Sequence, residues 1–494
     1  MRTEQARRNR RLGQMVMLAW LLTAAMAASA QAVQGDAGAA GAGFALKQLW
    51  AISDTTDGSV ALRPGNPAID AADGSTPVEA MRFSEAQEWA RQKSYVLGAS
   101  QSKSQVAYEL SRAALSGLLP SVEIRVGAGH ETSTPSSRLD TLTGQPLPTS
   151  SQSRGEAYAV LSQPLFDLAA VAELRRARSA HRASLADEVG VRGDLGYELT
   201  ASYFGAIEAS LALKLTQNQL DRLNRLWNWV SSRADAGGAS VADRERIRAR
   251  MLSAQASVED ATAQLTQAGL SLRRLTGVAP HAVVLPDAED APGIASLEDA
   301  LTLVSSGNAA VVTAMANEET AREERRAQLA RFSPTVKFEL SNSKSKNSGG
   351  IMGWKEDKRA MVILSMPLFS GGGDYFRQRA ALARQEQYAF ERQEAERSAR
   401  HGLEVAFNGL TLARQKIDSL RHQAQAQARV VQAFDAQLNA ASRNLLDVFD
   451  AYQQYHQSQM DLLRTCVQAI LLNHQVLRLT GQWRVAEAGT DTKE

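Results

Sequence analysis

Val336-Lys337-Phe338-Glu339-Leu340 is the stretch that decides the fold of this sequence, because apolar and charged residues alternate through it. Alternation with a period of two places the apolar side chains on one face of a β-strand and the charged side chains on the other. Val122-Glu123-Ile124-Arg125-Val126 has the same pattern 214 residues earlier. Each stretch follows a proline, Pro334 or Pro120, which cannot continue a preceding helix. The sequence therefore predicts strands with one apolar face, each preceded by a helix.

The same spacing relates other parts of the chain and indicates an internal duplication. Phe83-Ser84-Glu85-Ala86 corresponds to Leu297-Glu298-Asp299-Ala300 at a separation of 214 residues, and Leu275-Thr276-Gly277 corresponds to Leu479-Thr480-Gly481 at 204. The separation falls from 214 to 204 along the chain, so the two copies differ slightly in length, and loops tolerate such differences. A repeat of about 200 residues is too long for a solenoid unit, so we interpret the chain as a duplicated half-molecule.

We expect each copy to hold a helix, a hairpin of two strands, a very long helix and a last helix. The first helices are expected at about 80–117 and 296–331, and the loops inside the hairpins at 129–155 and 343–357. The expected organisation is a signal peptide at 1–30, a flexible leader at 31–79, a first repeat at 80–281 with its hairpin at 119–166, a linker at 282–295, a second repeat at 296–481 with its hairpin at 332–369, and a C-terminal tail at 482–494.

The N-terminus has the order of charge, apolar core and small residues that is typical of a secretory signal peptide. Five arginines precede an apolar run from Met15 to Met26, and Ala28-Ser29-Ala30 fits the cleavage site. A membrane anchor is the alternative, but twelve helical residues span about 18 Å, less than a bilayer core of about 30 Å. We expect an exported protein, whose net charge falls from +2 to −2 when this segment and its +4 are removed.

Composition and motifs exclude several classes of function. The near balance of 55 Lys and Arg against 53 Asp and Glu argues against a nucleic-acid-binding protein. The single cysteine, Cys466, excludes a disulfide framework and multi-cysteine zinc sites, and we expect it to be a buried thiol. The seven histidines form no metal-binding motif, and Gly371-Gly372-Gly373 lacks the lysine of a phosphate-binding loop. We expect no enzyme, no cofactor and no metal.

The long helices carry a coiled-coil pattern. Residues 374–437 contain no proline, and 64 residues of helix extend about 96 Å. In the heptad that runs from Leu403 to Phe434, nine of ten seam positions are apolar. A fibrous coiled coil is the alternative, but it does not account for paired strands or for a duplication.

The strands allow two interpretations, a hairpin packed on a soluble core or part of a transmembrane β-barrel. Membrane strands are about 9–11 residues long, apolar outside and polar inside. Because single-chain barrels begin at about eight strands, four strands cannot close. Three chains would together supply twelve.

With these features, the sequence resembles the TolC family of outer-membrane efflux and secretion channels from about residue 80 to Gly481. The residues that carry the resemblance are Leu119-Pro120-Ser121, Gln163-Pro164-Leu165-Phe166-Asp167, Ser202-Tyr203-Phe204, Leu275-Thr276-Gly277, Pro367-Leu368-Phe369-Ser370-Gly371-Gly372 and Leu446-Asp447-Val448-Phe449-Asp450-Ala451. The resemblance implies a mostly helical chain with a membrane β-barrel portion, in which a homotrimer forms a twelve-stranded barrel in outer-membrane lipid. That barrel would continue into an α-helical barrel in the periplasm, and the channel would bind a periplasmic adaptor and an inner-membrane pump.

The resemblance also implies a functional site where each long helix turns back, at about 438–442 and 235–240. Asp447 and Asp450 match acidic residues that ring a closed periplasmic aperture, and Arg443 matches a residue that holds it shut with Asp243 as partner. Two departures put the lock in doubt, since Leu438 replaces a tyrosine and Ala242 a hydroxyl residue. Alternatively, the acids are solvated residues favoured by the dipole at a helix start.

The motifs and the lack of a cysteine near the cleavage site resemble members that serve type I secretion. Such members export a large polypeptide, such as an RTX or haemolysin-type toxin, with an inner-membrane ABC transporter ATPase and a membrane-fusion protein. Multidrug efflux with a proton-driven pump is the alternative. A periplasmic coiled-coil scaffold would be a third class.

Overall fold

The computed structural model describes residues 42–55, 57–62, 77–133, 150–287, 293–294, 296–348, 351–369, 371–438 and 445–482. The expected signal peptide at 1–30 and the end of the expected tail, 483–494, lie outside these ranges. The chain forms two compact units, described separately below. The first unit comprises Met1–Gly98, Val191–Ala309 and Arg397–Glu494, and the second comprises Ala99–Gly190 and Ala310–Glu396.

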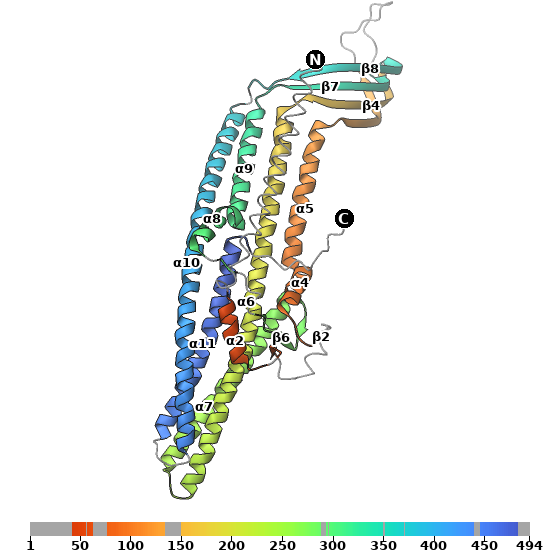
Figure 1. The fold of residues 1–494 in the computed structure, drawn as a ribbon. Helices are drawn as coiled ribbons and strands as arrows, with labels where there is room; N and C mark the ends of the chain where they lie inside the picture. The colour runs from red at the N-terminus through yellow and green to blue at the C-terminus, as the bar shows by residue number, and fades with distance from the viewer. Residues whose placement is uncertain are drawn as a thin grey trace, which may run out of the picture. The chain divides into compact units, whose positions relative to one another are not determined.

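The second unit contains a four-stranded antiparallel sheet in the order β3-β4-β7-β8 (Figure 1). The strands are β3 (Ser121–Ser133), β4 (Ser150–Phe166), β7 (Thr335–Ser348) and β8 (Ile351–Ser365). Each repeat supplies one hairpin, and the hairpins join where Leu161 of β4 faces Leu340 of β7. The expected loop at 343–357 was wrong, because the β7–β8 ladder runs through most of it and pairs Lys346 with Trp354. The expected loop at 129–155 was too long, because β3 extends to Ser133 and β4 begins at Ser150.

One face of β3 is apolar and is not covered by the described residues. Val122, Ile124 and Val126 are 67%, 72% and 75% exposed, as their alternation in the sequence predicts. On the other face of β3, the Arg125 guanidinium forms an ion pair with Glu123 at 2.6 Å. Packing on a soluble core would bury these three side chains, which the described residues leave exposed.

The first helix of each repeat is broken, which corrects the expected single helices at 80–117 and 296–331. The first repeat has α4 (Phe83–Lys93) and α5 (Tyr95–Leu115), and the second has α8 (Leu297–Gly307) and α9 (Ala309–Ala330). The breaks fall at Ser94 and Asn308, both in extended conformation. Short polar side chains favour such breaks because they bond to nearby backbone, as Ser94 does by accepting a hydrogen bond from the Leu97 N–H at 3.2 Å.

The long helices follow the predicted order in both repeats. They are α6 (Leu168–Asp235) and α7 (Val241–Thr276) in the first repeat, and α10 (Gly373–Leu438) and α11 (Leu445–Leu479) in the second. Gly277 ends α7 with φ of 69°, and Gly481 has φ of 70° just beyond α11, a conformation that glycine adopts without strain. Among the helices of the described ranges, none has the length and apolar content needed to cross a membrane.

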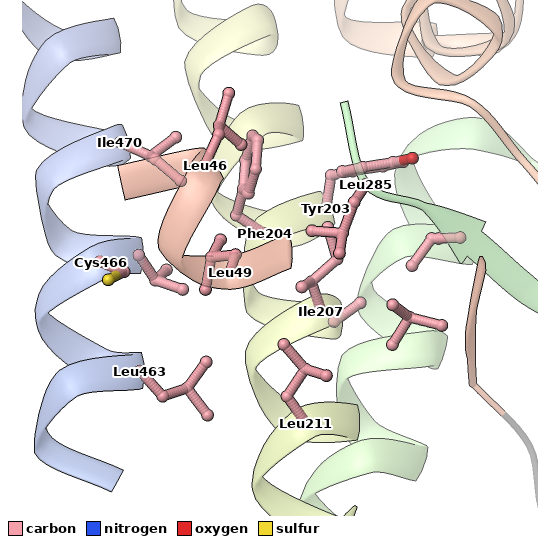
Figure 2. Packing of buried hydrophobic residues seen from close by; sticks show 14 of the residues in the cluster. Leu46, Leu49, Tyr203, Phe204, Ile207, Leu211, Leu285, Leu463, Cys466 and Ile470 are labelled. Atoms are coloured by element: carbon pink, nitrogen blue, oxygen red, sulfur yellow. The ribbon is translucent and has the colours of Figure 1, made fainter. Parts of the chain in front are cut away.

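The first unit shows that the expected flexible leader at 31–79 was wrong for part of its length. Residues 43–53 form α2 (Gly43–Ser53), whose Leu46 and Leu49 are buried in the core. Figure 2 shows α2 between α11, which contributes Leu463, Cys466 and Ile470, and α6, which contributes Phe204 and Ile207. The leader therefore includes a helix that the core of the repeats holds in place.

Two short strand pairs complete this unit. β1 (Ser59–Ala61) runs antiparallel to β6 (Ala282–Val284), and β2 (Pro77–Val78) runs parallel to β5 (Ala279–Pro280). The expected linker at 282–295 thus begins with a strand. Tyr203 of α6 fixes this region, because its hydroxyl donates to the carbonyl oxygens of Met81 at 2.9 Å and Val284 at 2.6 Å. The Cys466 thiol is buried, as predicted, and burial raises its pKa to about 12.

Candidate functional site at the helical turns

The turn between α6 and α7 forms where it was predicted. Gly237 has φ of 74°, and the N–H of Gly238 bonds to the Arg233 carbonyl at 2.8 Å, which closes the end of α6. Ser240 caps α7 by accepting a hydrogen bond from the N–H of Ala242 at 3.1 Å. An ion pair of 3.2 Å between Arg244 and Asp235 joins the two helices across the turn. This turn is thus held by both backbone and side-chain contacts.

The matching turn of the second repeat lies between the end of α10 at Leu438 and the start of α11 at Leu445. Residues 439–444, which include Arg443, lie outside the described ranges. Asp447 is in the first turn of α11, and Asp450 follows at the i+3 position, so the two share one face of the helix. Both are exposed, while Val448 and Phe449 between them are buried. With the described residues neither carboxylate forms a salt bridge.

Asp243 occupies the corresponding first turn of α7. Its carboxylate lies 3.4 Å from the guanidinium of Arg246, one turn further along the same helix. The structure therefore gives Asp243 a partner within its own repeat. Its expected contact with Arg443 involves a residue whose position is not described.

One apolar cluster packs the two turns together within the first unit. It joins α6 and α7 to α10 and α11, so Asp243 and Asp447 belong to neighbouring helix pairs with a common core. The buried residues of the cluster are Leu223, Leu226, Val230, Ile247, Val431, Val448, Phe449, Ala451 and Tyr452. The heptad seam predicted Val431, which is buried here.

Arginines cover the aromatic residues of this cluster. A guanidinium over an aromatic face is attracted by the ring's negative potential. The pairs are Arg222 with Tyr455 at 5.0 Å and with Tyr452 at 5.9 Å, Arg233 with Trp229 at 5.2 Å, and Arg250 with Phe449 at 4.7 Å. The contacts of Arg222 and Arg250 each join a helix of the first repeat to α11, so they bind the repeats to one another.

Sequence reasoning missed the most specific of these contacts. The hydroxyl of Tyr452 in α11 donates a short hydrogen bond to the carboxylate of Asp435 in α10. Tyr452 is 4% exposed, and its burial, together with this bond, raises the pKa of its hydroxyl. Tyr452 and Tyr455 lie at an i, i+3 spacing beside the acidic motif, and that spacing was the only signal in the sequence.

The side chains at these turns determine what chemistry the site could carry. Within the described ranges, His, Cys, Asp and Glu side chains form no group of three that could hold a metal ion. The charged residues at the turns are instead acids and arginines on the surfaces of packed helices. Long helical hairpins that end in charged turns, together with an open sheet whose strand β3 has an exposed apolar face, are typical of a channel-forming protein.

A comparison with protein families identifies the class. Residues 88–278 and 301–482 match the family described as outer membrane efflux protein, so the chain belongs to that family. The two matched segments correspond to the two repeats. The predicted resemblance and fold class are thereby confirmed, and the chain is a transport conduit rather than an enzyme. Among curated proteins, a search found no match to the sequence.

Solved structures with the same fold include outer-membrane channels of three pathogens. VceC, an outer membrane protein of Vibrio cholerae, has a TM-score of 0.67 at 17% identity, covering 81% of this chain and 96% of that one. The CmeC outer membrane channel of Campylobacter jejuni has a TM-score of 0.70 at 14% identity, covering 81% of this chain and 85% of that one. The open state of the MtrE outer membrane channel of Neisseria gonorrhoeae has a TM-score of 0.68 at 17% identity, covering 81% of this chain and 89% of that one.

Proposed function

We propose that three copies of this chain close a twelve-stranded barrel in the outer membrane, continued in the periplasm by a barrel of helices. The observation that carries the proposal is the open sheet. Its edge strands β3 and β8 have no partner on their outer sides among the described residues, and they are 13 and 15 residues long. Long unpaired edges invite pairing with another chain, and closure into a barrel removes them. The uncovered side chains of Val122, Ile124 and Val126 would then face lipid.

The oligomer is tested with protein purified from outer membranes in detergent. We expect mass photometry to give a trimer, and unheated samples to migrate as a trimer on denaturing gels. Ile124→Glu should prevent insertion, because it places a charge on the lipid face, whereas Arg125→Glu on the opposite face should be tolerated. A monomer, or equal insertion of both variants, would contradict the barrel.

Export begins, in this proposal, with removal of residues 1–30. The Arg-rich segment, the short apolar run and Ala28-Ser29-Ala30 support it. Intact mass and N-terminal sequencing of protein from the outer membrane should identify Gln31 as the first residue. A protein that keeps its first 30 residues would contradict the cleaved signal.

We infer that the channel is the exit duct of a tripartite type I secretion machine. An ABC transporter ATPase in the inner membrane would supply the energy, a periplasmic membrane-fusion protein would connect the two, and the cargo would be a large polypeptide of the RTX or haemolysin type. Support comes from Ser202-Tyr203-Phe204, from Leu446-Asp447-Val448-Phe449-Asp450-Ala451, and from Cys466 being the only cysteine, which leaves none for a lipid anchor at the mature end.

Multidrug efflux is the alternative, and the family name favours it. Deletion of the gene separates the two. Loss of a secreted polypeptide from the medium, with unchanged drug susceptibility, is expected for type I secretion. Increased drug susceptibility with normal secretion would overturn that assignment and support efflux.

Asp447 and Asp450 are proposed to line the periplasmic aperture. Both are exposed at the start of α11, and three chains would bring six carboxylates together. Crowded carboxylates attract cations. Asp447→Ala with Asp450→Ala should raise single-channel conductance in planar bilayers and weaken block by divalent cations. Asp461→Ala, further along the same helix, is the matched control. Unchanged conductance and block in the double variant would contradict the assignment.

Arg443 is proposed to hold the aperture shut through Asp243, despite the departures at Leu438 and Ala242. Because Asp243 also lies 3.4 Å from Arg246, the two arginines must be tested apart. Arg443→Ser should increase the open probability in bilayers, and Arg246→Ser should change it less. Gating of Arg443→Ser that is identical to the parent channel would exclude the lock.

A further inference from the structure

A hollow of about 370 Å³ lies among α6, α7 and α11 of the first unit, away from the helical turns. Small residues of α6 form much of its lining, and Gly205 has no heavy atom within 4 Å of where a Cβ would lie. The other small residues there are Ala201, Ala209 and Ala212 of α6 and Ala268 of α7. Small-molecule sites combine a concave apolar wall with polar groups, and here the small residues lie among polar and charged ones.

Some polar groups of the hollow lack partners among the described residues. The hydroxyl of Ser202 is buried and has no hydrogen-bond partner there. Glu208 is half-buried and Arg464 is exposed, and neither forms an ion pair with any described residue although both line the same hollow. Such groups are normally satisfied when they are removed from water. The Ser202 hydroxyl and the Glu208 carboxylate are thus shielded from water without a partner, and the exposed Arg464 lines the same hollow.

The carboxylate of Glu208 is the group of the hollow that desolvation destabilises in its charged form. Desolvation raises the pKa of Glu208, and the positive charge of Arg464 offsets only part of that effect. A half-buried carboxylate without a donor is stabilised when a cation reaches it. The guanidinium of Arg464 similarly lacks an acceptor. Gln264 and Gln267 of α7 add amide groups to the same lining.

We propose that this hollow binds a small zwitterionic solute, whose cationic group pairs with Glu208 and whose anionic group pairs with Arg464. The alanines and Gly205 provide room for a short apolar portion of the solute. A purely cationic or purely anionic ligand would leave one of the two charges unpaired. The site is distinct from the proposed aperture, and it does not depend on the proposed transport function.

The proposal is tested by isothermal titration calorimetry on the full-length channel in detergent, with leucine as the probe. Leucine carries both charges and a short apolar side chain. Isoamylamine keeps only its cation, and 4-methylpentanoate keeps only its anion. We expect saturable binding of leucine, and binding at least tenfold weaker for each analogue.

Variants assign the two charges. Glu208→Gln should abolish discrimination between leucine and 4-methylpentanoate, and Arg464→Gln should abolish discrimination between leucine and isoamylamine. Glu259→Gln, at an exposed position of α7 outside the hollow, should bind leucine as the parent does. Absence of leucine binding in the parent would overturn the proposal. A change of oligomeric state in Glu208→Gln, with no leucine binding in any variant, would also overturn the proposal, because a second copy of the chain would then cover the hollow. Conductance in bilayers, measured on the same preparations, tests the channel separately.

Discussion

Replacing Tyr452 by phenylalanine should loosen the start of α11, because it removes one hydrogen bond and leaves the ring in place. The hydroxyl donates to Asp435 of α10, and the ring lies in the apolar cluster under Arg222. A hydrogen bond to a charged group contributes about 1.5–3 kcal/mol. Asp435 is exposed, so water can replace the lost donor, and we expect the lower end, about 1.5 kcal/mol.

Amide hydrogen exchange followed by mass spectrometry measures this loss locally. A change of about 1.4 kcal/mol in the opening free energy corresponds to a tenfold faster exchange. We therefore expect roughly tenfold faster exchange over residues 445–455 in Tyr452→Phe, with little change over α2. A cycle with Asp435→Ala should return a coupling of about 1.5 kcal/mol between the two side chains.

Tyr455→Phe is the matched control. Tyr455 lies one turn further along α11 and also contacts Arg222, but its hydroxyl accepts a hydrogen bond from Gln459 of the same helix at 3.0 Å. Its removal breaks no link between helices, so exchange should stay within about twofold of the parent. Equal exchange in the two tyrosine variants, or zero coupling in the cycle, would refute the role assigned to the Tyr452 hydroxyl.

Three further predictions concern the first unit. Tyr203→Phe should lower its stability by about 1–3 kcal/mol, seen as faster exchange around Met81, because the buried hydroxyl that links Met81 to Val284 is lost. Burial lowers the pKa of His474 from 6.5 to about 4, so the folded state binds protons less readily than the unfolded state. The free energy of unfolding should therefore fall by about 3 kcal/mol as the pH drops from 6.5 to 4. Denaturant titrations of His474→Leu should not show this dependence on pH. Gly307→Ala should lower the melting temperature, since its Cβ would meet the Thr480 backbone. Gly269 lies inside α7 with open space around it, so Gly269→Ala should instead stabilise the protein by about 0.5–1 kcal/mol.

Local patterns predicted the parts of the fold that depend on neighbours in sequence. The alternation around Val336 predicted a strand, and Leu275-Thr276-Gly277 predicted the end of α7, since both signals lie within a few residues of their effect. The break at Ser94 was missed because a single polar residue is also common inside helices. Helix α2 was missed because Leu46 and Leu49 stand in a stretch rich in glycine and alanine, and their burial depends on α6 and α11, which are distant in sequence.

The candidate site was only partly accessible to the same reasoning. Asp447 and Asp450 were predicted as site residues through family motifs, which record positions along the chain, and they stay a prediction. The bond between Tyr452 and Asp435 crosses a turn, and no periodicity relates a donor on one helix to an acceptor on the next. Similarly, the hollow beside Glu208 exists only because three helices meet there. The sequence therefore predicted features that depend on contacts along one helix, but it did not predict contacts between helices.

The two repeats carry different charges at their turns. At the separation of 204 residues, Asp243 corresponds to Asp447, but Arg246 corresponds to Asp450. The first repeat thus holds an acid beside its own cation, at 3.4 Å, whereas the second holds two acids on one exposed face. Like charges at such spacing repel each other and are tolerated where cations or water can reach them. The difference agrees with the proposal that Asp447 and Asp450 of the second repeat line the hydrated aperture. Exchanging the two residues, with Arg246→Asp and Asp450→Arg together, should therefore alter the cation preference of the channel while leaving its net charge unchanged. An unaltered preference in bilayers would show that the turns contribute equally.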